Sequence, residues 1–535
     1  MKSFTSVKAD VLIVGGGLGG VSAALALADA GRTVVITEPT LWLGGQLTSQ
    51  MVPSDEHRHI EWTGASRSYR TLREGIRRYY RDWFPLTDAA RADPLLNPGA
   101  SWVSPIAADP RVCRAVIDGM LAPHVSSGRV TVLTETRPVG STMDGHRITS
   151  VRVTGPEGEH DLEADFFLDA SETGDLLDLA GIDHVSGRES RDETGEPSAA
   201  DTADPLDMQS ATWCFAMEHL DGTHTIDKPE LYEEFRDLRP AALGGARALS
   251  FDGPEEQNEH TFTYSLVPNP DDDPADIDID HRNMSSPIDL WTYRRVLARN
   301  QLRPGSAPSD VTIVNWPMND YVGGALFGTP DADLHAYRAR QMSLSLLYWM
   351  QTEAPRPDGG TGWPGLHLRS DMAGTEDGLA MAPYIRESRR IRALHTIREQ
   401  DVSTKRRDSP LTYSDSVGVG HYFWMDRHAS TGGRKGSADV PWPFEIPLGS
   451  LVPRTASNVL PAAKNIGTTQ ITNGSYRLHP VEWSIGEAAG SLAALCLDRR
   501  LAPQAVHADE RLVTDLQGAL RARGVQLHWP RRIQP

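Results

Sequence analysis

The amino-acid sequence predicts an α/β protein, and three features of its N-terminal part carry that prediction. Residues 9–38 read as a strand, a glycine turn, an alanine-rich helix and a second strand. Gly31 follows this helix, where a left-handed residue favours helix termination. The short apolar run at residues 165–169 is bounded by turn formers, as expected for a buried parallel strand. Further strands are expected at residues 129–135 and 148–154.

Size and charge narrow the class of protein. The chain has 535 residues and a formal net charge of -19 at pH 7. At about 100 to 200 residues per domain, this length predicts two or three domains. The negative charge offers no basic surface to a polyanion, so we expect no nucleic-acid binding.

Two features that are absent from the sequence indicate the cellular compartment of the protein. No apolar run reaches the roughly 20 residues that span a bilayer, and the sequence shows no signal peptide. The three cysteines are far apart and form no C-x-x-C pair. We therefore expect a cytoplasmic protein with no membrane anchor.

The glycine turn supplies the pattern G-x-G-x-x-G directly after a strand and at the start of a helix. Gly15 turns the chain, Gly17 lets the backbone approach a pyrophosphate, and Gly20 lets the helix pack close to the strand. The helix N-terminus attracts the phosphate charge. Glu38, at the end of the second strand, is placed to accept hydrogen bonds from ribose hydroxyls. The pattern predicts dinucleotide binding; a glycine-rich turn in an unrelated α/β fold is the alternative.

The residues after Glu38 bear on which dinucleotide binds, because the glycine pattern alone does not choose between NAD and FAD. Gly44, Gly45 and Gln46 follow Glu38 after a short loop. Two adjacent glycines would let the backbone lie against a flat ring system a dinucleotide's length away. Flavoproteins of the glutathione-reductase type look like this, and a plain loop is the alternative.

Several segments, in this order, resemble the broad FAD-dependent oxidoreductase family over most of the chain. They are residues 42–46 (WLGGQ), 169–175 (DASETGD), 315–317 (NWP), 319–321 (NDY), 384–390 (YIRESRR), 473–480 (NGSYRLHP) and 485–490 (IGEAAG). The resemblance implies FAD as cofactor and a Rossmann-like FAD-binding domain of the glutathione-reductase type, with a second α+β substrate domain. It places Gly174 in a segment that returns under the FAD. It places Asn465, Gly467, Arg477 and Gly486 in the segment that closes over the flavin.

The order of motifs predicts a discontinuous FAD-binding domain. We expect it to comprise residues 1–205 and 440–500, with a substrate domain at residues 206–439 whose approximate boundaries allow interleaving. Residues 501–535 are expected to form a helical C-terminal extension. Helices are predicted at residues 229–238, 289–300, 333–353 and 481–497.

The closing segment also bears on the type of chemistry. A helix that begins near Pro480 would direct its positive end at the pyrimidine end of the flavin, where negative charge accumulates on reduction. The small residues at 485–490 would equally allow close helix packing. Aromatic hydroxylases carry a Gly-Asp motif where this chain has Asn465 and Gly467, and no second G-x-G-x-x-G follows a strand. Both observations disfavour a hydroxylase and a built-in NAD(P)H domain.

Hydride removal from a C–H bond needs a base for the accompanying proton, and histidine is well tuned for that role near neutral pH. The densest group of suitable residues includes His421, Asp426 and His428. Alternation along a strand would place Asp426 and His428 on one face and His421 on the other. His479, directly before the proline that opens the last helix, is a further candidate. A structural role for each histidine is the alternative.

Two other groups of residues are candidate binding sites. Arg477 and the arginines at positions 386, 389 and 390 could clamp a carboxylate or a flavin phosphate; solvation or pairing with Glu387 is the alternative. Residues 55–59 (DEHRH) resemble a metal site. Adjacent polar residues in a loop rarely converge on one ion, so we expect no metal.

The sequence therefore predicts an FAD-dependent oxidoreductase, either a dehydrogenase or an oxidase, that takes a hydride from a small organic molecule to flavin N5. Its expected partners are a small-molecule substrate and oxygen or another electron acceptor. One alternative is a flavin-dependent reductase of a C=C bond, and another is a non-catalytic flavin-containing interaction protein. The substrate, the mode of FAD attachment and the oligomeric state stay open at this point.

Overall fold

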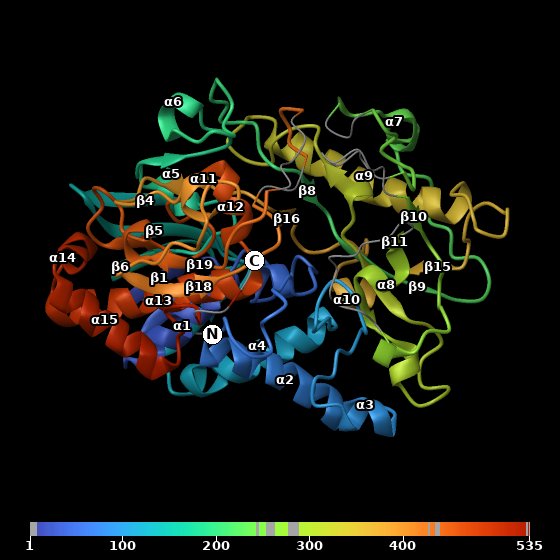
Figure 1. Ribbon diagram of the computed structural model, residues 1–535, viewed down its shortest axis with the longest axis horizontal. Coiled ribbons are helices and arrows are strands. Elements are labelled where there is room, and N and C mark those ends of the chain that lie inside the picture. The colour runs from blue at the N-terminus through green and yellow to red at the C-terminus, as the bar shows by residue number, and fades with distance from the viewer. Residues whose placement is uncertain are drawn as a thin grey trace.

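The computed structural model describes residues 8–241, 245–252, 263–276, 288–425, 429–433, 439–530 and 533. Figure 1 shows two units side by side: the first unit holds a large sheet with helices α1 and α13 along it, and the second unit has helix α9 along its upper edge. Asp426 and His428, both predicted at the substrate site, lie outside the described residues.

The first unit is built on a seven-stranded sheet with the order β3-β2-β1-β6-β5-β4, in which β20 also pairs with β6. Its strands are β1 (Lys8–Val14), β2 (Val34–Thr37), β3 (Val130–Leu133), β4 (Arg137–Asp144), β5 (Arg147–Gly155), β6 (Gly158–Asp169) and β20 (Val459–Pro461). The pairs β1–β2, β2–β3, β1–β6 and β6–β20 are parallel, and β4 and β5 are antiparallel. The predicted α/β class is confirmed, and a strand near the C-terminus completes a sheet that the N-terminus begins.

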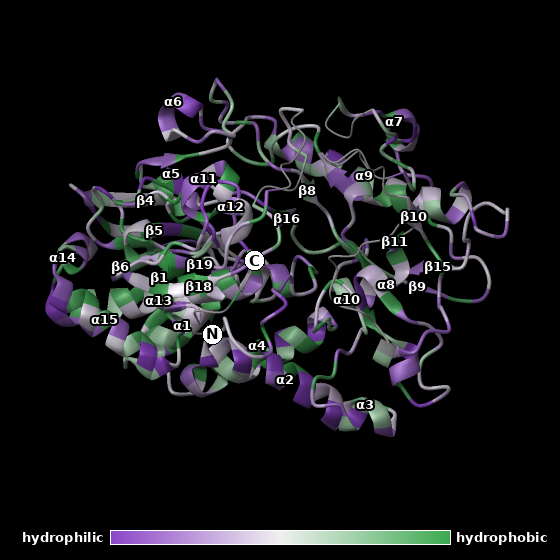
Figure 2. Ribbon diagram, viewed as in Figure 1, coloured by the Kyte–Doolittle hydropathy of each residue, from purple (hydrophilic) through white to green (hydrophobic). Residues whose placement is uncertain are grey.

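The remaining helices outside the second unit come from both ends of the chain. The longer ones are α1 (Leu18–Asp29), α2 (Arg67–Trp83), α4 (Pro110–Ser126), α13 (His479–Arg499) and α15 (Glu510–Arg523). The shorter ones are α3 (Asp88–Ala92), α5 (Asp175–Leu179), α6 (Arg191–Thr194), α11 (Glu399–Val402), α12 (Gln470–Tyr476) and α14 (Pro503–Ala508). Hydrophobic residues, green in Figure 2, gather on the strands and on α1 and α13, whereas α6 at the edge is purple.

The predicted strand–turn–helix–strand at the N-terminus is confirmed. β1 is almost wholly buried, and the turn after it begins with Gly15 at φ +101°, a backbone conformation that favours glycine. α1 consists of small apolar residues and ends before Gly31, whose φ of +82° closes the helix as expected.

Helices α1 and α13 pack backbone to backbone. A Cβ atom on Gly486 would lie 2.0 Å from the carbonyl oxygen of Gly19, and one on Gly490 would lie 2.7 Å from that of Ala23. The Ser22 hydroxyl donates a hydrogen bond of 2.8 Å to the carbonyl of Trp483. Glycine is therefore required at position 486 by the approach of two helices.

The second unit contains smaller sheets. A four-stranded antiparallel sheet has the order β12-β13-β9-β15, and a three-stranded one has the order β14-β8-β16. The strands are β8 (Ala211–Thr212), β9 (Phe215–His219), β10 (Tyr264–Ser265), β11 (Ile288–Asp289), β12 (Arg295–Leu297), β13 (Val311–Val314), β14 (Asp320–Tyr321), β15 (Leu366–Leu368) and β16 (Tyr384–Ile385). The helices are α7 (Tyr232–Asp237), α8 (Leu290–Tyr293), α9 (Ala332–Thr352) and α10 (Ser370–Ala373). The helices predicted at 229–238, 333–353 and 481–497 are confirmed by α7, α9 and α13.

The helix predicted at residues 289–300 is wrong. Asp289 caps only one turn, α8, by accepting hydrogen bonds from the amides of Trp291 and Thr292. The chain then becomes strand β12, where Arg295 pairs with Thr312 of β13. The fully buried Arg295 guanidinium holds Asp310 at 3.0 Å, and this tertiary pairing overrides the local helical pattern.

The two units interleave. Strand β17 (Arg390–Ile391) pairs with β7 (His184–Val185), and Ile391 belongs to the hydrophobic cluster that holds Val14 and Phe167 of the first unit. Strands β18 (Ser416–Gly420) and β19 (Phe444–Pro447) pair with each other beside α13. Within the described residues, no helix has the length and apolarity needed to cross a membrane.

The arrangement predicted for residues 421–428 is not formed in the part that the structure describes. Strand β18 ends at Gly420, before His421. The carbonyl of Gly420 accepts a hydrogen bond from the indole of Trp529, at 3.2 Å, in place of a further strand pairing. Alternation along a strand therefore does not orient His421.

Candidate functional site

Three of the glycines in the turn after β1 have distinct surroundings. A Cβ on Gly15 would lie 2.3 Å from the carbonyl oxygen of Ala170, and a Cβ on Gly20 would lie 2.1 Å from that of Gly15. Gly17 differs from both. A Cβ there would meet only a side-chain oxygen of Glu172 at 3.3 Å and the Ala170 carbonyl at 3.9 Å.

Gly17 has room for a side chain and a backbone that accepts one. It is the N-cap of α1, with φ -62° and ψ -175°, an extended conformation that any residue adopts. Neither packing nor backbone strain inside the protein demands glycine here. Space for a ligand against the helix N-terminus is the remaining physical reason for its lack of a side chain.

The glycine pair at positions 44 and 45 lies directly against this turn. The amide of Gly44 donates to the carbonyl of Gly16 at 2.8 Å, and a Cβ on Gly45 would lie 2.9 Å from the Gly17 Cα. We expected this pair a dinucleotide's length away. The structure differs because the segment folds back on the glycine turn, so the pair borders the same end of the ligand space.

Gln46 links this turn to the start of α13. Its amide nitrogen donates to the Glu482 carboxylate at 2.6 Å and to the carbonyl of Arg477 at 3.1 Å. The side chain is buried, and its Oε1 atom has no hydrogen-bond partner. An acceptor atom is thus left facing the junction of the two segments.

Glu38 is buried beside the glycine turn. Its carboxylate accepts hydrogen bonds from the Gly16 amide at 3.1 Å and from the Thr40 hydroxyl at 2.7 Å. Burial raises the pKa of Glu38 to about 7, although the Thr40 and Gly16 hydrogen bonds oppose the shift.

A charged cluster at the same place was missed in the sequence. Lys464 is buried and pairs with Glu172, whose carboxylate lies beside Gly17 and Gly45. Burial raises the pKa of the neighbouring Glu482 in the first turn of α13. The only sequence signal for this cluster was a lysine directly before the Asn465 segment. Glu482 gave no such signal, because an acidic residue is common in the first turn of any helix.

The other residues predicted to bind the cofactor have structural surroundings. Gly174 adopts φ +68° against Arg389, and Gly467 packs against the carbonyl of His395. Asn465 donates to the Asp169 carbonyl at 3.0 Å and thereby ties the closing segment to the end of β6. Gly486 lies in the contact between α1 and α13. Their contact with a cofactor stays a prediction.

His479 is the first residue of α13 and is fully buried. Its Nδ1 atom accepts a hydrogen bond of 3.0 Å from the Asp55 amide, so the proton of the neutral ring sits on Nε2, which has no partner. Burial lowers the pKa of His479 to about 4, although the Asp55 carboxylate opposes the shift. Near neutral pH, His479 therefore offers a hydrogen-bond donor.

Two buried guanidiniums lie around His479. Arg294 pairs with Asp55 at 3.4 Å, between Nη1 and Oδ1. Arg477 hydrogen-bonds to the Tyr384 hydroxyl and lies over that ring, 5.7 Å from its centroid. Sequence reasoning noted Arg477 but missed Arg294, because no spacing rule connects the two.

His421 lies in a different group. Its ring centroid is 5.9 Å from that of His57, 5.8 Å from that of His59 and 6.4 Å from that of Trp529. Burial lowers the pKa of His57 to about 3. In this aromatic group His57 and His421 are buried, whereas His59 and Trp529 are partly exposed.

The metal-like segment at residues 55–59 uses its side chains elsewhere. Asp55 pairs with Arg294, and Glu56 pairs with Arg73 at 3.0 Å. Across the described ranges, no three His, Cys, Asp or Glu side chains group as metal ligands.

Comparison with protein families decides which family the chain represents. The model of the FAD dependent oxidoreductase family matches residues 10–520. The chain belongs to this family. Comparison with curated proteins finds no match.

Comparison with solved structures finds matches of low sequence identity and low TM-score. L-proline dehydrogenase from P. horikoshii is 16% identical, with 35% of this chain and 25% of that chain covered and a TM-score of 0.18. A geranylgeranyl bacteriochlorophyll reductase-like protein from Thermoplasma acidophilum is 16% identical, with 41% and 48% covered and a TM-score of 0.23. p-Nitrophenol 4-monooxygenase from Pseudomonas putida DLL-E4 is 16% identical, with 40% and 48% covered and a TM-score of 0.24. The chain thus spans half or less of the length of each.

FAD is the cofactor of this oxidoreductase family, and the residues around Gly17 fit it. The open Cβ position of Gly17 lies at the N-terminus of α1, where a phosphate is favoured. The flexible Glu172 carboxylate would turn aside, and Lys464 supplies a compensating positive charge. We expect Glu38 to hold the ribose.

The raised pKa of Glu38 predicts a pH dependence for this flavoprotein. Ribose hydroxyls that donate to Glu38 would favour its ionised form, so FAD binding releases a proton wherever apo-Glu38 is protonated, below about pH 7. The affinity of the apoprotein for FAD should therefore rise with pH, by up to about tenfold per unit, and level off above pH 7. Fluorescence titrations of apoprotein with FAD check this. Glu38→Gln should flatten the profile, and an equal slope in that variant would contradict the role of Glu38.

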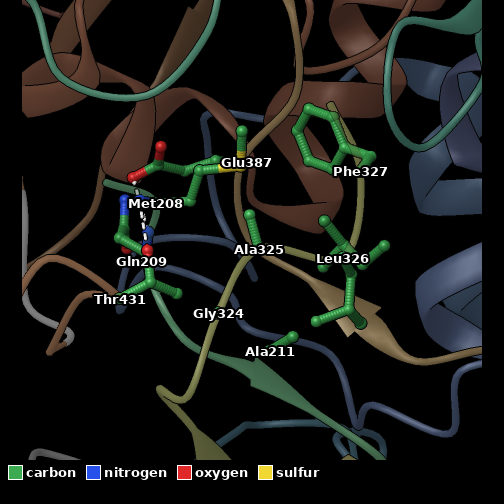
Figure 3. Close-up of a pocket in the computed structure, with 10 residues that line it drawn as sticks. Met208, Gln209, Ala211, Gly324, Ala325, Leu326, Phe327, Glu387 and Thr431 are labelled. Carbon is green, nitrogen blue, oxygen red and sulfur yellow. Dashed lines mark hydrogen bonds between the residues drawn. The ribbon is translucent and has the colours of Figure 1, made fainter. Parts of the chain in front are cut away.

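A small cavity of about 10 Å³ lies beside strands β8 and β16 of this oxidoreductase. Figure 3 shows Gln209 and Glu387 on one side of it and Phe327 on the other, and the backbone N–H of Gln209 donates a hydrogen bond to the Glu387 carboxylate at 3.0 Å. The volume suits one water molecule. It is too small for an organic substrate.

Proposed function

We propose that this flavoprotein is a dehydrogenase or an oxidase that removes a hydride from a C–H bond of a small organic molecule. The observation that carries the proposal is a single nucleotide-binding arrangement in the described part of the chain. There, only residues 15–20 place the full pattern G-x-G-x-x-G between a parallel strand, β1, and a helix, α1. The larger sheets of the second unit are antiparallel. The described residues contain no second fold of this kind that could bind a nicotinamide dinucleotide. This favours the organic molecule as the electron donor.

FAD, when bound, supplies the two-electron acceptor for such a hydride. The residues of the chain provide the setting. The Nε2–H of His479 and the N-terminus of α13 both favour negative charge in their vicinity. Gln46 fixes the turn at residues 43–46 to the start of this helix. These groups support acceptance of electrons close to α13.

The proton that leaves with the hydride needs an acceptor. His421 is the predicted acceptor, and it is buried with its ring close to those of His57 and Trp529. His479 is less suited to this task than the sequence predicts, because its Nδ1 atom already accepts the Asp55 amide and its Nε2 atom carries the proton.

Anaerobic reduction of the purified protein tests the proposed function. We expect a yellow protein that absorbs at about 450 nm by general flavin chemistry and that loses this band when an alcohol, amine or acid donor is added. NADH and NADPH should leave the band unchanged within the same time. Oxygen consumption then separates an oxidase from a dehydrogenase. Rapid reduction by NADPH, followed by reoxidation with an alkene, would instead support a C=C reductase and contradict the proposal.

A further inference from the structure

Three buried nitrogen donors from separate segments converge near the start of α13. Arg294 follows α8 in the second unit, Arg477 caps α12, and His479 begins α13. All three side chains are more than nine-tenths buried. In each of them one nitrogen, Nε of the two arginines and Nε2 of His479, has no hydrogen-bond partner.

Shared neighbours place these three residues around one space. Asp55 donates its amide to His479 and pairs through its carboxylate with Arg294. Burial lowers the pKa of Arg477, but Tyr384, Tyr422 and Asp55 outweigh burial and raise it; Asp55, Tyr384 and Tyr422 likewise raise the pKa of Arg294 against the effect of burial. The same three residues thus lie near both guanidiniums, and two of them are in contact: Asp55 with Arg294 and Tyr384 with Arg477.

The two guanidiniums in this space differ in their partners. Arg294 and Arg477 are both cationic, His479 is neutral near pH 7, and Asp55 is the carboxylate paired with Arg294. In the described ranges no carboxylate forms an ion pair with Arg477, whose partner is the neutral Tyr384 hydroxyl. Glu387 also raises the pKa of Arg477, and its Oε2 atom lies 3.9 Å from Arg390, which itself pairs with Glu189 at 2.8 Å. Among the described residues, the buried Nε–H of Arg477 and those of Arg294 and His479 lack an acceptor, and an anion in this space would supply one.

The donors also determine which kind of anion can bind in this space. Guanidinium and imidazole N–H groups only donate here, so the matching group is one that only accepts, such as a carboxylate or a phosphate. The phosphates of FAD are expected at the N-terminus of α1. Among the described residues, neither guanidinium has a hydrogen bond or an ion pair with residues 15–20. A carboxylate on the substrate is the better match.

We propose that the substrate of this oxidoreductase is a small organic acid whose carboxylate binds between Arg294 and Arg477 and accepts a hydrogen bond from His479. The proposal rests on the proposed function, since it names the substrate class of that same site. Asp55 acts as a positioning residue because it holds both Arg294 and His479.

Formate, the smallest carboxylate, tests this proposal on the FAD-loaded protein, with formamide as its uncharged counterpart. At constant ionic strength, formate should raise the Tm and perturb the flavin absorption bands, whereas formamide should do neither. Arg477→Met removes the unpaired cation without leaving a carboxylate partner behind. It should keep FAD and weaken formate binding by at least about tenfold. Arg477→Lys, which keeps the charge but loses the planar fork, should fall between the two.

Arg152→Met is the matched control, because Arg152 is exposed and pairs with Asp161 on the surface. It should respond to formate as the wild type does. Three results would overturn the proposal: equal responses to formate and formamide, no response to formate at about 100 mM, where a millimolar site is saturated, or loss of FAD from Arg477→Met, which would assign the arginine to the cofactor's phosphates.

The formate assay does not require catalytic turnover, so the proposed carboxylate site and the proposed function can be refuted independently. A formate response that depends on Arg477, in a protein that only NADPH reduces, would contradict the dehydrogenase or oxidase and keep the anion site. Rapid reduction by uncharged donors without any formate response would do the reverse.

Discussion

Replacing Gly17 by valine is expected to abolish FAD binding while the apoprotein stays folded. The extended backbone of Gly17 accepts a β-branched residue, and the nearest obstacle to its Cβ is the flexible end of Glu172 at 3.3 Å. The new methyl groups would occupy the approach of the phosphates to the α1 amides. We expect the Kd for FAD to rise by at least about 100-fold, which corresponds to about 2.8 kcal/mol. The flavin content of purified protein and the unfolding curve of apoprotein measure the two effects.

Gly20→Ala is the contrasting variant for this experiment. Its Cβ would lie 2.1 Å from the carbonyl oxygen of Gly15, so it should lower the stability of the apoprotein itself. Tight FAD binding by Gly17→Val would refute the assignment of this turn to the phosphates.

The second large effect is expected at Gly486, where alanine should destabilise the apoprotein. The added Cβ would lie 2.0 Å from the Gly19 carbonyl and 2.3 Å from the Ser22 hydroxyl, so α1 and α13 would have to separate. Overpacking of this kind costs about 1 to 3 kcal/mol or more. The gain in helix propensity from glycine to alanine, about 1 kcal/mol, offsets only part of it. Urea unfolding of apoprotein measures the net change.

Two further helical glycines calibrate that measurement. Gly490→Ala would bring a Cβ to 2.7 Å from the Ala23 carbonyl, whereas Gly518→Ala in α15 meets nothing within 4 Å. We expect stability to increase in the order Gly486→Ala, Gly490→Ala, Gly518→Ala, with the last at or above the wild type. A stable Gly486→Ala variant that loses only FAD would show instead that Gly486 serves the cofactor.

Local signals made the N-terminal part of the fold predictable. Gly15, the small residues of α1 and Gly31 each specify their backbone without reference to distant residues. The stretch at 289–300 carries a helical pattern that is equally local, but Arg295 is drawn into β12 by its partners Asp272 and Asp310. Partners so far along the chain leave no mark on local periodicity.

The candidate site was predictable to a smaller extent, for the same reason. Gly17 and Glu38 follow a fixed spacing that one ligand imposes. The group around His479 combines Asp55, Arg294 and Tyr384, which come from three separate segments and meet only in the folded protein. Its buried donors without a hydrogen-bond partner arise only when these segments meet.

The joining of the chain's two ends has a consequence for biosynthesis. Ser22 and Trp483, which hold α1 against α13, are 461 positions apart. At about 5 to 20 residues per second, a ribosome delivers the second roughly 25 to 90 seconds after the first. Until then α1 lacks the partner that covers it, and a nascent or truncated polypeptide without α13 presents an apolar surface to chaperones and proteases. Uptake of the yellow cofactor would accordingly mark the last stage of the protein's maturation.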